Sequence, residues 1–181
     1  MRYFFVIPLV IAVGAVSACS NAGGQETENV QSSQQGYVLK RGEGEALFDG
    51  QTLVKASPRT GSQGGEMFWS HLGPGFSTGI HIHHAADEFF YVVSGAGVAL
   101  VGDKEVPIET GDVVFVPTGQ DHRLKTSGGV PLEIVYLVDR PGLASEFRDG
   151  HVLSDGGKVP LTLEQLNQIS QKYGTTYKTL E

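Results

Sequence analysis

The feature that most constrains the fold is a series of short apolar segments between residues 45 and 138, separated by glycine, proline or aspartate. Segments such as 89–93 and 113–116 are rich in β-branched and aromatic residues, which favour strands. Between two of the segments, Gly102-Asp103 is typical of a tight hairpin turn. Many short strands at near-regular spacing predict an all-β antiparallel sandwich or barrel. The predicted strands are 45–48, 52–55, 66–72, 78–83, 88–93, 97–101, 104–108, 112–116, 121–126 and 132–138.

Composition supports a single globular domain and excludes several classes of protein. The chain has 181 residues, enough for one domain, and its 25 glycines are about twice ordinary usage, as expected for many turns. The net charge of −7 argues against nucleic acid as a partner, because phosphate binding needs a clustered basic surface. A single cysteine excludes an internal disulfide and a cysteine-based zinc site.

The N-terminal residues 1–18 predict a lipoprotein signal peptide. Arg2 precedes an apolar run at 3–16, which is shorter than the roughly 20 residues that a membrane-spanning helix needs. The run ends in the sequence VSAC, which resembles a bacterial lipobox, where cleavage precedes the cysteine and its thiol carries lipid. Cys19 is therefore the predicted lipidation site. The alternative is an ordinary signal peptide followed by an incidental cysteine.

The residues after the predicted cleavage site divide into a tether and a folded domain. Residues 19–36 contain almost nothing apolar, so they predict a flexible tether, and residues 37–181 predict a single domain. The predicted location is extracytoplasmic, with the protein bound to the membrane of the cell envelope through its lipid. In a Gram-negative cell this means the periplasm, and Ser20 after the cysteine resembles the pattern of lipoproteins sorted to the outer membrane.

One C-terminal helix is well signalled. Thr162 is a suitable N-cap, Gln165 completes a capping box, and Gly174 is the expected residue just beyond the helix. Residues 140–160, by contrast, predict a loop that covers one edge of the sheet or reaches a partner subunit.

Three of the six histidines stand in a pattern that suggests metal binding. His81 and His83 are two apart in a predicted strand, so both point to one face. Glu88 follows five residues later, and His122 comes after a turn at 117–119. Three imidazoles and one carboxylate suit a divalent metal ion of borderline hardness, and four protein ligands leave two positions of an octahedron open.

The same residues resemble the two motifs of the cupin superfamily. The first motif, G-x5-H-x-H-x4-E-x6-G, is matched at every interval by Gly75, His81, His83, Glu88 and Gly95.

The second cupin motif, G-x5-P-x-G-x2-H-x3-N, is matched by Gly111, Pro117, Gly119 and His122. Thr126 stands where the family has asparagine, which is not a metal ligand in the family, so this departure concerns only the surroundings of the ligands.

The resemblance covers residues 47–138 and implies a small antiparallel β-barrel of the jelly-roll type. It implies that His81, His83, Glu88 and His122 hold one metal ion inside the barrel, and it brings in a homodimer as one candidate assembly. The alternative is a chain that has kept the fold and binds no metal.

The lining of the expected pocket is less determined. Phe90 and Val92 share a face with Glu88 and are candidates for pocket lining, although the same positions suit core packing. In segment 66–72 either alternate row of side chains could face inward. A charged cavity would favour sugars or acids as ligands, whereas an aromatic cavity would favour phenolic compounds.

The leading functional prediction is a metalloenzyme acting on a small molecule, and an oxygenase or oxidase is what the resemblance implies for this ligand set. Glu88 is a candidate for proton transfer. The alternatives are a lipoprotein that binds a small molecule or a metal without turnover, a zinc-dependent isomerase or lyase, and an assembly protein that binds another envelope protein.

The metal is predicted to be copper, iron, manganese, nickel or zinc. For a protein that folds after export, affinity alone favours copper and zinc over iron and manganese, and zinc does not support redox chemistry.

Overall fold

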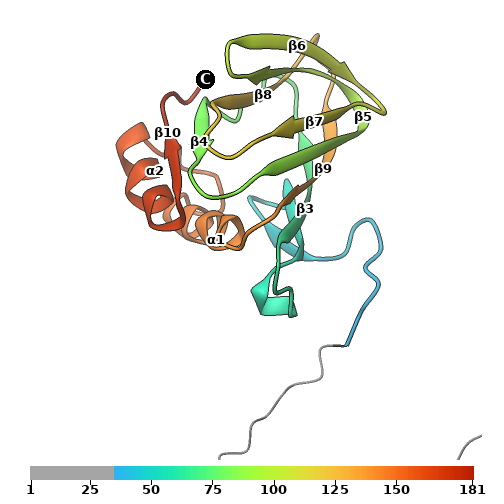
Figure 1. Cartoon of the computed structure of the whole chain (residues 1–181), viewed down its shortest axis with the longest axis vertical. Helices are drawn as coiled ribbons and strands as arrows, with labels where there is room; N and C mark the ends of the chain where they lie inside the picture. Colours follow the sequence, from blue (N-terminus) through green and yellow to red (C-terminus); the bar gives the residue numbers. More distant parts are fainter. Residues whose placement is uncertain (1–34) are drawn as a thin grey trace, which may run out of the picture. The chain divides into compact units, whose positions relative to one another are not determined.

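The computed structural model describes residues 35–181 (Figure 1). The predicted signal peptide, Cys19 and almost all of the predicted tether lie outside the described residues. The strands are β1 (Glu45–Leu47), β2 (Thr52–Ala56), β3 (Glu66–Leu72), β4 (His81–His83), β5 (Glu88–Val101), β6 (Lys104–Glu109), β7 (Val113–Val116), β8 (His122–Thr126), β9 (Leu132–Val138) and β10 (Thr175–Tyr177). The α-helices are α1 (Leu143–Leu153) and α2 (Leu163–Ser170), and 3-10 turns occupy Pro58–Thr60 and Gln171–Tyr173.

The strands form two antiparallel sheets that share β5, in the order β1-β2-β3-β9-β5-β8-β4-β10, with β6 and β7 also pairing with β5. One core cluster contains side chains from both sheets, among them Phe68, Ile108, Leu124 and Ile134. The prediction of an all-β antiparallel barrel is therefore confirmed.

Strand β5 joins the two sheets, and here the sequence prediction of two separate strands, 88–93 and 97–101, was wrong. The first half pairs with β7 and β9, and the second half with β6 and β8. Between the halves a register shift and Gly95, with φ of +90°, bend the strand without ending it. A side chain at Gly95 would meet the backbone oxygen of Pro131, so only glycine fits this close approach.

Strand β3 shows which alternate row faces inward. Phe68, Ser70 and Leu72 are buried, whereas Met67 and His71 point outward. Phe68 stacks on Tyr136 of β9, with ring centroids 4.9 Å apart. The inner face of this sheet is thus aromatic and contains a few hydroxyl groups.

The predicted loop at 140–160 was wrong, because α1 occupies much of it. The helix has Gly142 at its N-cap, which offers no side chain to the free backbone N–H groups. The buried carboxylate of Glu66 replaces it, since its Oε2 accepts hydrogen bonds from the backbone N of Gly142 at 3.1 Å and of Ala144 at 2.8 Å. This cap comes from a residue more than 70 positions earlier, so the local sequence carried no sign of it.

The predicted helix after Thr162 is confirmed as α2, including its capping box. Thr162 Oγ1 accepts from the backbone N of Gln165, and the Gln165 side chain accepts from the backbone N of Thr162.

Beyond Gly174 the chain forms β10, which the sequence did not predict and which pairs antiparallel with β4. In Figure 1 α1, α2 and β10 gather on one side of the barrel, next to β4. Within residues 35–181 no helix has the length and apolar character that crossing a membrane requires.

Candidate metal centre

The structure brings together His81, His83, Glu88 and His122 from three strands. Their ligand atoms all lie within 4.8 Å of one another, and all four side chains are buried. His81 and His83 alternate on one face of β4, Glu88 begins β5, and His122 begins β8 directly opposite His81. The spacing that suggested a metal site in the sequence thus corresponds to one cluster in the barrel.

The turn at 117–119 positions His122 against β4. The backbone N of Gly119 donates to the carbonyl oxygen of His83 at 2.8 Å, and that of Gln120 to Pro117. Asp87 Oδ1 accepts from both the backbone N and the hydroxyl of Thr118, which ties the turn to the start of β5. Asp87 therefore organises the turn, while its neighbour Glu88 points into the cluster.

The ring nitrogens that face away from the cluster are all engaged. His81 Nδ1 lies 3.1 Å from the carbonyl oxygen of Gly79, and His122 Nδ1 lies 3.0 Å from that of Gln120. A carbonyl oxygen only accepts hydrogen bonds, so both Nδ1 atoms carry the proton. Their Nε2 atoms are then left as the candidates for metal ligation.

His83 is held differently from the other two histidines. Its Nδ1 lies 3.1 Å from the hydroxyl of Thr175 in β10, and a hydroxyl can either donate or accept. Its Nε2 is buried, lies 3.2 Å from Glu88 Oε2, and has no hydrogen-bond partner of good geometry in the part of the chain that the structure describes. A buried nitrogen without a partner at the centre of such a cluster fits a metal ligand.

The cluster also favours the anionic form of its carboxylate. Burial raises the pKa of Glu88, but the imidazoles of His122, 3.0 Å away, and His83 outweigh burial and hold that pKa well below its ordinary value. Burial, together with charge on His122 and His83, lowers the pKa of His81 well below 6.5. Three nitrogens and one carboxylate oxygen form a donor set that suits a divalent transition metal, so the residues fit the group that the sequence implied.

A cavity of about 270 Å³ opens beside the cluster, with His81, His83 and Glu88 in its wall. Six aromatic side chains line it, namely Phe48, Phe76, Phe90, Tyr136, Phe147 and Tyr177. Among the described residues, neither lysine nor arginine contributes to this wall. The cavity is therefore mostly apolar and aromatic, with its polar groups confined to the cluster and a few hydroxyl and amide groups.

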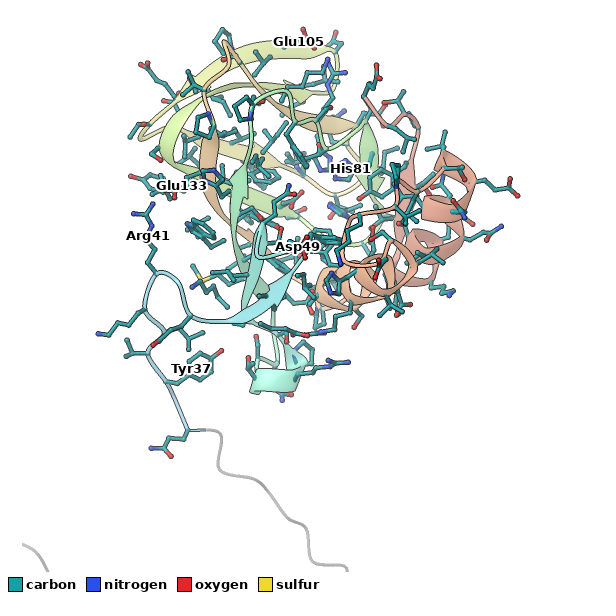
Figure 2. The ribbon with its side chains drawn as sticks, turned by 180° about the vertical axis from the view of Figure 1, so that it is seen from behind. Tyr37, Arg41, Asp49, His81, Glu105 and Glu133 are labelled. Carbon is teal, nitrogen blue, oxygen red and sulfur yellow. The ribbon has the colours of Figure 1, made fainter. Side chains whose placement is uncertain are left out.

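The β1–β2 loop and α1 complete the wall of the cavity. The backbone N of Phe48 donates to His151 Nδ1 in α1 at 2.9 Å, and the Phe48 ring packs edge-on against Phe147. Figure 2 shows Asp49 of this loop next to the helical side of the molecule, and it also labels His81 on β4. Thr126, the departure from the second motif, bonds to the backbone of Gly73 and Phe76 and so holds another part of the wall.

The chain matches the Cupin_2 family, described as a cupin domain, over residues 68–138. Over 104 residues it is 33% identical to tetracenomycin polyketide synthase protein TcmJ of Streptomyces glaucescens, a match that covers 57% of this chain and 68% of that protein. The chain belongs to the cupin superfamily.

Two further similarities place this cupin among its relatives. It is 37% identical over 67 residues to the oxalate-binding protein of Thermotoga maritima, which is 37% of this chain and 55% of that protein, so the match spans about half of the relative's length. The structure of the polyketide cyclase RemF from Streptomyces resistomycificus has a TM-score of 0.52 and 18% identity, and the match covers 57% of this chain and 79% of that one. This last likeness supports the fold.

The other site residues predicted from the sequence lie as follows. Phe90 lines the cavity, whereas Val92 is fully buried in the core and is not part of the cavity wall. Cys19, the predicted lipidation site, lies outside the described residues. Proton transfer by Glu88 stays a prediction.

Sequence reasoning missed three residues around the cluster, and all of them belong to the C-terminal segment of this cupin. Thr175 contacts His83, and Tyr177 stacks on His81 with centroids 4.9 Å apart and an interplanar angle of 15°. Glu146 is buried and interacts with the side chains of Thr175 and Tyr177. The two contacts join residues more than 90 positions apart. The only local sign was Gly174, which ends a helix and leaves the chain free to begin a strand.

Proposed function

We propose that this cupin is a metal-dependent enzyme of the oxygenase or oxidase type, acting on a small, largely apolar aromatic molecule that carries oxygen atoms. The observation that carries the proposal is the aromatic cavity of about 270 Å³ that opens directly onto the buried cluster. An apolar pocket with a few convergent polar groups is the usual form of a small-molecule site. The relative TcmJ, named a polyketide synthase protein, is consistent with a substrate of this kind.

His81, His83 and His122 would hold the metal through their Nε2 atoms, and Glu88 through its carboxylate. A metal held there would supply Lewis-acid chemistry toward an oxygen atom of the substrate and, if redox-active, redox chemistry with oxygen. Glu88, the carboxylate in the described wall of the cavity, is the candidate to take a proton, and for that it would have to leave the metal.

Hydroxyl groups on the inner face of the barrel give the substrate polar contacts. Thr52 and Ser70 hydroxyls lie 2.8 Å apart, and Ser70 Oγ lies 3.3 Å from the Tyr136 hydroxyl. Burial raises the pKa of Tyr136, so this phenol stays neutral and can donate or accept. With neither lysine nor arginine in the described wall, a second negative charge on a substrate would be poorly compensated away from the metal.

A second candidate is a protein that binds a small molecule without turnover. It is favoured by the similarity to the protein named oxalate-binding protein, although the matched region is only 37% of this chain. A third candidate, a zinc-dependent isomerase or lyase, uses the same four ligands and differs in the metal.

The first experiment measures the metal content of mature protein 19–181 recovered from its own export compartment, with no metal or chelator added. Near one equivalent of copper, iron, manganese or nickel supports the proposal, whereas zinc supports an isomerase or lyase. A protein without metal contradicts the proposal and leaves the binding protein as the leading candidate.

The second experiment compares ligands on the metal-loaded protein by calorimetry and oxygen uptake. We expect a dihydroxylated aromatic compound to bind and to be consumed with oxygen, and a sugar alcohol of similar size to do neither. Tighter binding of oxalate than of the aromatic compound, without turnover, would favour the binding protein.

We also propose that this cupin is anchored to the cell envelope through Cys19 and forms a homodimer. The outer face of the β3, β9, β5 and β7 sheet exposes an uncharged apolar patch, formed by Met67, Phe89, Tyr91, Val113, Phe115 and Leu137. Such a patch favours an interaction surface, and an uncharged patch meets its own copy without repulsion. Light scattering tests the dimer and mass spectrometry of the membrane fraction tests the lipid. A monomer in solution contradicts the proposed homodimer, and an unmodified Cys19 contradicts the proposed lipid anchor.

A further inference from the structure

We propose that Thr175 is a positioning residue of the metal centre, which fixes the proton of His83 on Nδ1 and so keeps Nε2 available to the metal. The inference rests on the proposed function only in taking the cluster as a metal site. Thr175 lies in β10, outside the region that matches the cupin family, so this property belongs to the C-terminal segment of this chain.

The register of β10 on β4 places its side chains opposite the ligands. Thr175 pairs with His83 and Tyr177 pairs with His81, whereas Thr176 between them pairs with Ile82 on the other face. Residues directly opposite each other in an antiparallel pair share a face of the sheet and contact one another. The two inward side chains of β10 therefore each contact one histidine of the cluster.

The hydrogen bonds of His83 distinguish it from the other two histidines. Carbonyl oxygens require His81 and His122 to carry the proton on Nδ1, but the Thr175 hydroxyl, 3.1 Å from His83 Nδ1, permits either form. Only if Thr175 accepts does His83 present a free lone pair at Nε2. The Thr175 hydroxyl therefore needs another hydrogen-bond acceptor, so that its own proton does not point toward His83.

Glu146 supplies the acceptor for that proton. Its carboxyl is buried beside Thr175, receives a hydrogen bond from Ser170 Oγ at 2.7 Å, and interacts with the Thr175 hydroxyl. Within residues 35–181 its Oε2 has no hydrogen-bond partner of good geometry, so it retains accepting capacity. The resulting order is His83 Nδ1–H to Thr175 Oγ1, and Thr175 O–H toward Glu146.

Tyr177 adds a second restraint on the same pair of strands. Its ring lies nearly parallel to that of His81, with 4.9 Å between centroids, and this stacking fixes the plane of the imidazole. A ligand whose ring plane and proton are fixed in advance loses less freedom when the metal binds.

The test is Thr175→Val, which replaces the hydroxyl by a methyl group of similar volume. Affinity is measured for zinc alone, by competition with a chromophoric chelator, on the full mature chain. We expect binding to weaken by about 10–100-fold, the cost of losing the group that orients a ligand histidine. Thr175→Ser, which keeps the hydroxyl, should restore most of the affinity.

Thr176→Val is the matched control, because it makes the same change at the next residue, whose hydroxyl contacts the exposed His84 at 2.9 Å. We expect its zinc affinity to equal that of the wild type. Nitrogen-15 NMR of the imidazoles gives a second measurement that a merely structural change would not alter. In the metal-free proteins it should show the His83 proton on Nδ1 in the wild type and shifted toward Nε2 in Thr175→Val.

Equal zinc affinity and an unchanged His83 proton position in Thr175→Val overturn the inference while leaving the metal site intact. If Thr175→Val does not fold, Thr175→Ala removes the same hydroxyl, and equal affinity there has the same meaning. A wild type that binds no zinc or other metal contradicts both this inference and the proposed function. Zinc binding that depends on Thr175, without any turnover, contradicts only the proposed enzyme.

Discussion

The barrel, residues 45–138, and the C-terminal segment, residues 140–177, contribute to the same cluster in different ways. The barrel supplies all four candidate ligands from β4, β5 and β8, and the pairing of β4 with β8 places His81 opposite His122. The C-terminal segment supplies no ligand, yet it contacts two of the histidines and completes the cavity wall. The difference suggests that the barrel determines whether a metal binds. The C-terminal segment then sets how strongly the metal binds and which side chains line the cavity beside it.

The largest effect should come from removing a ligand of the barrel. We expect His122→Ala to lower the metal content by more than the roughly 10–100-fold that loss of an orienting residue costs, because a donor atom itself is lost. Metal analysis of the purified protein measures this. His71→Ala, a histidine that points outward from β3, is the control and should keep the wild-type content. Equal content in His122→Ala and wild type would exclude this cluster as the metal site.

The second effect concerns the attachment of the C-terminal segment to the barrel. Glu66→Ala removes the acceptor for two buried backbone N–H groups at the start of α1, so we expect the free energy of unfolding to fall by about 2–4 kcal/mol. Glu66→Gln keeps one accepting oxygen and should lose less. Chemical denaturation measures both, with Glu109→Ala at an exposed position as the control.

Metal affinity in the same Glu66 variants sharpens the comparison between the two regions. If the segment orients His83 and His81, zinc affinity should fall in Glu66→Ala together with the attachment of α1. A variant that is less stable but binds zinc as tightly as the wild type would show that the barrel alone sets the affinity.

The smallest effect is a dependence of stability on pH that comes from the segment. Burial raises the pKa of Glu146 above its ordinary 4.5, although hydrogen bonding from Ser170 and Thr175 opposes it. The folded protein therefore binds the carboxyl proton of Glu146 more tightly than the unfolded chain does. The stability from this difference is fully present below pH 4.5 and is lost as the pH rises through the folded-state pKa of Glu146. Glu146→Gln stays neutral, so relative to wild type it should become more stable as the pH rises from 4.5 toward neutrality.

Denaturation of the metal-free proteins at several pH values in that window measures the difference. Glu109→Gln, at an exposed position, is the control. A difference between Glu146→Gln and wild type that does not change with pH would contradict the assignment of a raised pKa to Glu146.

The barrel could be predicted because its signals are local. A strand alternates sides every residue, so the spacing of His81 and His83 already put them on a common face, and the turn at 117–119 indicated where His122 would come. Glu88 was added by the resemblance to the first cupin motif. The error in β5 arose because Gly95 suggested a turn, whereas a glycine with φ of +90° can also bend a strand that remains hydrogen-bonded. Which row of β3 faces inward was open because both rows contain apolar side chains.

The C-terminal segment could be predicted only where its signals are local as well. The capping box of α2 is contained within four residues, and it was found. Helix α1 and strand β10 were not, because the groups that complete them, Glu66 and β4, lie far away in the sequence.

The sequence by itself determined an antiparallel all-β fold and the spacing of the candidate ligands, because strand period and turn chemistry act between near neighbours. Its resemblance to the two cupin motifs then implied the barrel and the four residues that could hold a metal. Only the tertiary structure decided that the cavity is aromatic, that Glu66 caps α1, and that Thr175 and Tyr177 contact the ligand histidines. These contacts depend on which surfaces pack together, and packing joins residues that no local pattern connects.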